Sequence, residues 1–165
     1  MIRQATLTDL PALLNLFAEA RQFMATSGNP DQWADGYPSP ALLRSDIEAG
    51  RSYVLEEQRE ILVSFYFAPG PDRTYQTIDG AWHTDGPYHV IHRIASATHG
   101  KGAAARCVSW CKEQAPVLRI DTHHDNRVMQ RFLQKQGFAP CGVIHLDNGA
   151  PRLAFDWQGE TAVTA

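Results

Sequence analysis

Two different periods of hydrophobic and polar residues alternate along this chain. In residues 10–24, apolar side chains recur every three or four positions, which predicts an amphipathic helix. Residues 52–56 and 61–67 are rich in β-branched and aromatic side chains and flank the polar turn EQRE, which predicts two neighbouring strands. Ahead of these strands, Ser39-Pro40 predicts the start of a second helix, because serine caps a helix and proline fits its first turn. We expect Gly50 to end that helix.

The second half of the chain alternates strands with helices. Residues 88–95 form an apolar run that predicts a central strand, and residues 117–122 predict the next one. Residues 126–137 predict an amphipathic helix that begins at an asparagine cap and ends at a glycine. Residues 143–146 and 152–157 flank an Asp-Asn-Gly turn, which is a strong signal for a β-hairpin.

Two weaker strands are predicted at residues 2–5 and 75–78. The order of elements mixes antiparallel strand pairs with strand–helix–strand units. This order favours an α+β fold, in which about four helices flank a mixed, mostly antiparallel sheet. We expect residues 1–157 to form one domain, and the small and polar residues 158–165 to form a flexible tail.

The composition indicates an ordinary globular protein. The 165 residues carry a net charge of −3, which argues weakly against non-specific nucleic-acid binding because such binding needs a basic surface. No apolar run approaches the ~20 residues of a membrane span. The cysteines are odd in number and no secretory signal is evident, which favours a reducing compartment. We therefore expect a cytoplasmic protein with neither a nucleic-acid nor a membrane partner.

Three cysteines, Cys107, Cys111 and Cys141, raise the question of a zinc site. The chain contains no Cys-x-x-Cys or His-x-x-x-His spacing, which zinc sites commonly use. Cysteine is also often buried as a small apolar residue. We therefore expect no metal and no cysteine nucleophile.

A glycine-containing turn connects the central strand to the helix that follows it. The turn and the start of the helix read His99, Gly100, Lys101, Gly102, Ala103 and Ala104. Backbone N–H groups at a helix N-terminus attract anions, and glycine lets phosphates approach the backbone closely. Glycine is also common in plain turns, so this segment by itself leaves a phosphate site and a simple connection both open.

Two stretches together resemble the GNAT superfamily of N-acetyltransferases, which use acetyl-CoA. In residues 99–104, the two small positions of the family's pyrophosphate motif are kept, and His99 replaces its leading arginine or glutamine. The second stretch is NRVMQRFLQKQGF, residues 126–138. It keeps four residues of a second family motif, namely Asn126, Lys135, Gly137 and Phe138.

This resemblance covers nearly the whole chain, and it implies a sheet that splays open at its centre with acetyl-CoA bound there as acyl donor. The residues that it implies in cofactor binding are Ile94, Ala95, His99, Gly100, Lys101, Gly102, Ala103, Ala104, Asn126, Phe132 and Lys135. One departure bears on the chemistry, because the family's tyrosine, often assigned as the acid that protonates the CoA thiolate, falls at Leu133. The resemblance therefore supports the fold and the cofactor better than the family's usual acid.

The implied reaction is direct transfer of an acetyl group to a primary amine of a small molecule or a peptide. An amine with a pKa near ~10.4 is mostly protonated at neutral pH, so a base is useful. His92 on the central strand and His123 after the next strand are the candidate catalytic residues, because imidazole titrates near neutral pH. A structural histidine bonded within the sheet is the alternative for His92, and His123 alternatively lines the acceptor site. Backbone N–H groups near Ile94 and Ala95 are candidates to stabilise the oxyanion.

Three further residues are candidates for contact with the acceptor amine. Trp33 and Tyr37 lie in the loop between the first two helices, which shapes the acceptor pocket in the family. Their alternative is to anchor that loop to the core. Asp121 ends a strand, where it either binds the acceptor amine or caps a turn.

Two functions without turnover remain open at this point. The first is an acyl-CoA-binding module, which remains possible because Leu133 and His99 depart from the family's motifs. The second is a protein-interaction domain, which is disfavoured because Gly100, Gly102 and Asn126 match those motifs. An exposed edge strand in residues 143–157 also offers a surface for a homodimer.

Overall fold

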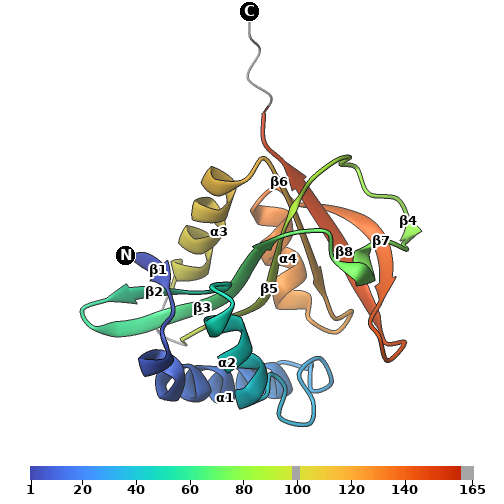
Figure 1. Ribbon diagram of the computed structural model, residues 1–165. Coiled ribbons are helices and arrows are strands. Elements are labelled where there is room, and N and C mark those ends of the chain that lie inside the picture. The colour runs from blue at the N-terminus through green and yellow to red at the C-terminus, as the bar shows by residue number, and fades with distance from the viewer. Residues whose placement is uncertain (98–100, 161–165) are drawn as a thin grey trace, which may run out of the picture.

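The computed structural model describes residues 1–97 and 101–160. Its strands are β1 (Ile2–Gln4), β2 (Ser52–Glu57), β3 (Glu60–Pro69), β4 (Asp79–Gly80), β5 (His89–Ser96), β6 (Val117–Thr122), β7 (Ala139–His145) and β8 (Pro151–Gln158). They form one sheet in the order β1-β2-β3-β5-β6-β8-β7-β4, shown in Figure 1. Only β5 and β6 are parallel among these neighbours, and every other pair is antiparallel. The predicted α+β fold with a mostly antiparallel sheet is confirmed.

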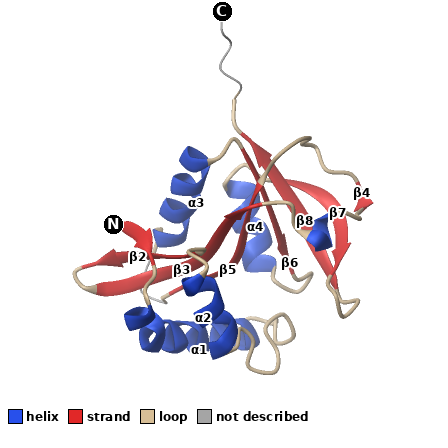
Figure 2. Ribbon diagram, viewed as in Figure 1, coloured by secondary structure: helices blue, strands red, loops and turns tan. Residues whose placement is uncertain are grey.

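Helices cover both faces of this sheet, as Figure 2 shows. They are α1 (Leu10–Thr26), α2 (Pro40–Glu48), α3 (Ala103–Gln114) and α4 (Arg127–Lys135), with short 3₁₀ helices η1 (Leu7–Asp9) and η2 (Arg73–Tyr75). The predicted caps are present: Ser39 Oγ accepts from the Leu42 N–H at 3.1 Å, and Asn126 Oδ1 accepts from the Met129 N–H at 3.0 Å. Gly50 follows α2 with a φ of +70°, as the predicted glycine stop requires.

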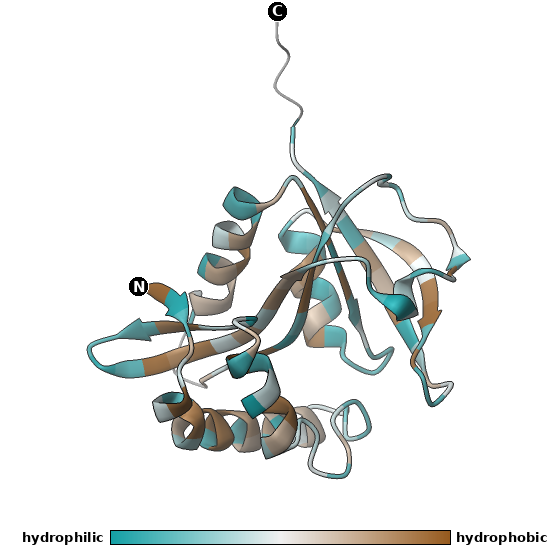
Figure 3. Ribbon diagram, in the orientation of Figure 1, coloured by the Kyte–Doolittle hydropathy of each residue, from teal (hydrophilic) through white to brown (hydrophobic). Residues whose placement is uncertain are grey.

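The core is divided between the two faces of the sheet. On one face, Leu13 and Phe17 of α1 pack with Val54 of β2. On the other face, Cys107 of α3 and Leu133 of α4 pack with residues of β3, β5 and β6. Figure 3 shows that hydrophobic positions gather along these central strands. No helix among the described residues is long and apolar enough to cross a membrane.

The segment between β3 and β5 differs from the expectation. The strand predicted at residues 75–78 is wrong, because residues 73–75 form η2 and the short strand β4 follows at Asp79–Gly80. Asp72 caps η2 by accepting from the Thr74 N–H at 2.9 Å, which turns the chain and buries Tyr75. Because β4 pairs with Gly142 and Val143 of β7, part of the hairpin edge considered for a homodimer is already occupied.

The centre of the sheet opens where β5 and β6 diverge. These strands pair only at His89–Leu118 and Val90–Arg119, although β5 continues to Ser96 and β6 to Thr122. On the other side of β5, the register with β3 shifts between Ser64 and Tyr66, so β5 carries a bulge. Arg93 lies in this bulge with a φ of +49°, a backbone conformation that non-glycine residues rarely adopt. The divergence and the bulge together place the side chains of β5 beside an open space.

Candidate active site

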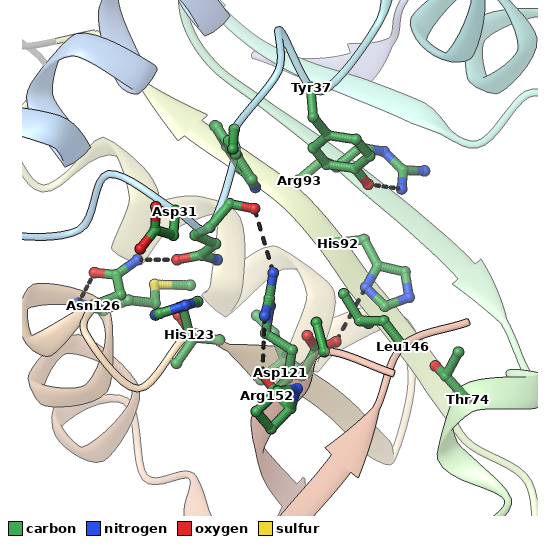
Figure 4. Close-up of a pocket in the computed structure, with 18 of the residues that line it drawn as sticks. Asp31, Tyr37, Thr74, His92, Arg93, Asp121, His123, Asn126, Leu146 and Arg152 are labelled. Carbon is green, nitrogen blue, oxygen red and sulfur yellow. Dashed lines mark hydrogen bonds and ion pairs between the residues drawn. The ribbon is translucent and has the colours of Figure 1, made fainter. Parts of the chain in front are cut away.

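A cavity of about 720 Å³ lies where β5 and β6 diverge. The loop between α1 and α2 and the β7–β8 hairpin complete its walls, as Figure 4 shows. Segments that are far apart in the sequence therefore meet here. Among the predicted residues, the cavity is lined by Trp33, Tyr37, His92, Ile94, Asp121, His123 and Asn126.

His92 projects from β5 into this cavity and lies between two carboxylates. Its Nε2 is 2.8 Å from Asp72 Oδ2, and its Nδ1 is 3.6 Å from Asp121 Oδ1. The His92 side chain is 21% exposed, so it is accessible from the cavity but largely removed from bulk water. The first nitrogen is held by a hydrogen bond, and the second faces a carboxylate just beyond hydrogen-bond distance.

Both carboxylates are held in place by further groups. Asp72 also accepts from the Thr74 backbone and hydroxyl, at 2.9 and 2.7 Å. Burial opposes ionisation of Asp72, but the hydrogen bonds from His92 and Thr74 outweigh it and lower its pKa to about 2. Tyr75 donates its hydroxyl to Asp121 Oδ1 at 2.5 Å. Burial, followed by the charge of Asp121, raises the pKa of Tyr75, so this phenol stays protonated and positions Asp121.

His123 lies at the end of β6 and is 7% exposed. Its Nδ1 accepts from the Asp125 backbone N–H at 3.0 Å. Burial, followed by the charge of Arg152, lowers the pKa of His123, so the imidazole is neutral at neutral pH. His123 lines the cavity from β6, whereas His92 lines it from β5.

Trp33 and Tyr37 line the cavity from the loop between α1 and α2. Trp33 is 8% exposed and packs against Phe17, with ring centroids 5.4 Å apart. The Tyr37 hydroxyl accepts from Arg93 Nη1 at 3.2 Å, and Arg93 is also paired with Asp46 at 2.8 Å. Both aromatic residues therefore anchor the loop and face the cavity at once.

The predicted cofactor residues divide into three groups. His99 and Gly100 lie outside the described residues, while Lys101 is exposed beside the start of α3. Gly102 caps α3 with a φ of +76°, and Ala103 and Ala104 form its first turn. No atom of the described residues lies within 4 Å of the position that a Cβ of Gly102 would occupy. The described residues therefore leave room for a ligand beside Gly102.

The remaining cofactor candidates lie on β5 and α4. Ile94 lines the cavity, whereas the side chain of Ala95 is buried in the core beside α1. The Asn126 side-chain amide donates to Gln32 Oε1 at 2.9 Å, which ties α4 to the α1–α2 loop. Phe132 packs partly against the core, and Lys135 is exposed. Leu133, at the family's tyrosine position, is fully buried and is not available as an acid.

Two groups of side chains among the described residues bring metal-ligating atoms together. They are His83, Cys141 and Asp156, and His123, His124 and Asp125, with the ligand atoms of each group within 4.8 Å of one another. Sequence spacing did not reveal either group. Cys107 and Cys111 instead lie in the core, where burial raises the pKa of Cys107 to about 12.

Sequence reasoning missed three residues of the cavity wall or its support. Asp72 and Tyr75 occupy a segment rich in proline and glycine, in which the sequence predicts only the strand at residues 75–78. Arg152 begins the last strand and lines the cavity. A polar residue inside an apolar strand pattern was the available signal for Arg152, whereas no local pattern marks Asp72.

No protein-family model and no curated protein sequence matches the chain, but solved structures do. A GNAT-family acetyltransferase from Streptococcus agalactiae is 31% identical with a TM-score of 0.87, and the match covers 98% of this chain and 96% of that one. A proposed acetyltransferase from Staphylococcus aureus is 27% identical, with a TM-score of 0.71 and coverage of 96% and 98%. A GNAT-family acetyltransferase from Listeria monocytogenes is 18% identical, with a TM-score of 0.70 and coverage of 96% and 94%, and therefore shows the fold alone.

Proposed function

This chain belongs to the GNAT family of N-acetyltransferases, and we propose that it transfers an acetyl group from acetyl-CoA directly to an amine held beside His92. The observation that carries this proposal is the position of His92. Its imidazole lies between Asp72 and Asp121, in a cavity that opens at the divergence of β5 and β6. A small-molecule or peptide amine that enters this cavity meets a base and a carboxylate together.

The residues at the start of α3 fit the pyrophosphate of acetyl-CoA. The first N–H groups of a helix have no partner within the helix, so they are available to an anion. Gly102 leaves open space beside them, and Lys101 adds a positive charge nearby. We assign the pyrophosphate to this turn, together with His99 and Gly100. Acetyl-CoA supplies the thioester carbonyl carbon that the amine attacks.

Asp121 and His92 deliver the amine in its neutral form. Asp121 binds the acceptor ammonium, because its Oδ1 faces His92 Nδ1 across 3.6 Å. When His92 Nε2–H donates to Asp72, Nδ1 carries the lone pair and accepts a proton from the ammonium. The charge of Asp72 then stabilises the imidazolium, as an aspartate does for the histidine of a serine hydrolase.

The backbone at the bulge in β5 is assigned to stabilise the negative charge that develops on the thioester oxygen. As the C–N bond forms, negative charge develops on the carbonyl oxygen, and backbone N–H groups near Ile94 and Ala95 are assigned to stabilise it. The positively charged nitrogen of the tetrahedral intermediate then gives its second proton to solvent as the C–S bond breaks, which leaves a neutral amide and the CoA thiolate. Solvent returns a proton to the thiolate, because the buried Leu133 offers none and a thiol with a pKa near ~8.5 is a good leaving group.

Thermal unfolding with acetyl-CoA, free CoA or ATP tests the donor. Binding to the native state at 100 times Kd adds about 2.7 kcal/mol of stability, so acetyl-CoA and CoA raise the midpoint whereas ATP does not. Gly102→Glu removes this shift, because a charged side chain in a left-handed position blocks the turn.

Gly86→Glu is the matched control. Gly86 has a φ of +75° and open space around its Cβ position, but it does not line the cavity. This variant carries similar backbone strain and keeps the shift with acetyl-CoA. No shift in the wild-type protein at high ligand concentration would overturn the assignment of acetyl-CoA as donor.

A further inference from the structure

Arg152 is a buried arginine that has no counter-ion among the described residues, and it lines the reaction cavity. It lies at the start of β8 and is 8% exposed. It donates two hydrogen bonds to backbone carbonyls. Nη1 donates to the Pro151 carbonyl at 2.9 Å, and Nη2 donates to the Gln32 carbonyl at 3.4 Å. Within residues 1–97 and 101–160, no carboxylate lies within 4.0 Å of its guanidinium. A guanidinium has five N–H donors, so three of them have no acceptor in the part of the chain that the structure describes.

Arg93, which is half-buried, and the buried Arg119 are satisfied differently. Arg93 is paired with Asp46 and also donates to Tyr37. Arg119, which is 7% exposed, donates to Thr84 and lies over the rings of Trp82 and Tyr88, at 4.3 and 4.1 Å. Arg152 has neither a carboxylate nor an aromatic ring in contact among the described residues. A buried charge without a partner is unfavourable, so its position in the cavity wall indicates a ligand that pairs with it.

The groups around Arg152 indicate which kind of ligand would bind there. Figure 4 shows its guanidinium in the part of the cavity between His123 and Asp121. Burial lowers the pKa of Arg152, and the nearby charge of Asp121 counteracts this without pairing with it. Asp121 is also the carboxylate that faces His92 Nδ1. An anionic group on Arg152 would therefore lie a short distance from the position assigned to the acceptor amine.

We propose, on the basis of the acetyl transfer proposed above, that Arg152 binds a carboxylate of the acceptor, and that the acceptor is therefore a free amino acid or a similar amino carboxylate. The ammonium contacts both Asp121 and His92 from the cavity, and the carboxylate accepts from the N–H groups of Arg152 that the described residues leave unpaired. A planar guanidinium matches a carboxylate with two parallel hydrogen bonds. The charges of the acceptor and of the cavity are then complementary at both ends.

Matched sets of acceptors test this site in the wild-type enzyme. Each set contains an amino acid, its carboxamide and its decarboxylated amine, and CoA release with acetyl-CoA gives kcat/KM for each. The amino acid of the preferred set is expected to exceed its carboxamide by about 100-fold, because the amide leaves the buried guanidinium uncompensated. Equal or better activity with the carboxamide or the decarboxylated amine would overturn the carboxylate site.

Substitution of Arg152 sharpens the test. Arg152→Gln is expected to remove the preference for the carboxylate, mainly through KM, while the decarboxylated amine keeps its rate. Arg152→Lys, which preserves the charge and the fold, recovers part of that preference. Arg119→Gln is the control, because it removes an equally buried arginine outside the cavity and leaves the ratio between amino acid and carboxamide unchanged.

Three further outcomes separate the possible failures. A preference for succinyl-CoA over acetyl-CoA that depends on Arg152, without a preference for amino acids, would assign the carboxylate to the acyl donor and overturn the acceptor site. A thermal shift with acetyl-CoA but no acetylation of any amino carboxylate would overturn the acceptor site alone. The absence of any shift would instead contradict the donor assignment.

Discussion

Two histidine–aspartate pairs in this protein have nearly the same geometry but different surroundings. His92 Nε2 lies 2.8 Å from Asp72 Oδ2, and His83 Nδ1 lies 3.0 Å from Asp156 Oδ1. Asp156 also accepts from the His83 backbone N–H and from the Thr84 hydroxyl, at 2.7 and 3.0 Å. That carboxylate joins the loop before β5 to β8.

The two pairs differ in the surroundings of the histidine ring. The His83 side chain is 56% exposed, whereas the His92 side chain is 21% exposed and its second nitrogen points to Asp121 across the cavity. A short distance to a carboxylate therefore does not distinguish a base from a structural contact. A candidate base also needs a second ring nitrogen that faces a ligand site and is largely removed from bulk water, as in His92.

Substitution of His92 is expected to have the largest effect. His92→Gln lowers kcat/KM by about 10²- to 10⁴-fold, the usual contribution of a general base, because no group remains beside Asp121 to accept the amine proton. The thermal shift with acetyl-CoA stays intact, since His92 is not assigned to the pyrophosphate. Retention of the wild-type rate in this variant would reject His92 as the base and leave His123 as the candidate.

Asp156→Ala is expected to destabilise the protein, while the variant that remains folded keeps most of its kcat/KM. The variant leaves the Thr84 hydroxyl and the His83 N–H without their buried acceptor, at a cost of about 3 kcal/mol in the free energy of unfolding. Urea denaturation measures this loss. A stable variant with a large loss of kcat/KM would contradict the structural role of this pair.

Asp72 adds a dependence of stability on pH. Its pKa is about 2 in the folded protein and 3.8 in an ordinary aspartate. The folded state therefore disfavours protonation of Asp72. The resulting stabilisation, about 2 kcal/mol, is complete above about pH 4 and is lost as the pH falls through about 2. Urea denaturation between pH 5 and pH 2 is expected to show a shallower loss in Asp72→Asn than in the wild type, and parallel curves would contradict it.

His83→Ala is expected to have the smallest effect. The side chain is largely exposed, so its pair with Asp156 contributes less than about 1 kcal/mol, and the backbone N–H of residue 83 still donates to Asp156. Both the midpoint of unfolding and kcat/KM should stay close to those of the wild type. A rate loss comparable to that of His92→Gln would show that the comparison between the two pairs is wrong.

Local signals predicted most of the elements, because their causes lie within a few residues. The caps at Ser39 and Asn126, the stop at Gly50 and the strand at residues 117–122 depend on side chains and φ angles at those positions. The strand expected at residues 75–78 failed because Tyr75 is buried by a 3₁₀ turn that Asp72 caps. A strand propensity does not distinguish that packing from pairing in a sheet.

The sequence by itself determined the order of helices and strands outside residues 73–80, the glycine turn before α3 and the replacement of the family's tyrosine by Leu133. These properties follow from periodicity and residue identity at neighbouring positions. The tertiary structure alone decided that Asp72, His92 and Asp121 lie together, and that Arg152 is buried with no carboxylate of the described residues within 4.0 Å. These contacts depend on the register of β3, β5 and β6 and on the divergence of β5 from β6. They join segments that are far apart in the chain, so no local sequence pattern predicts them.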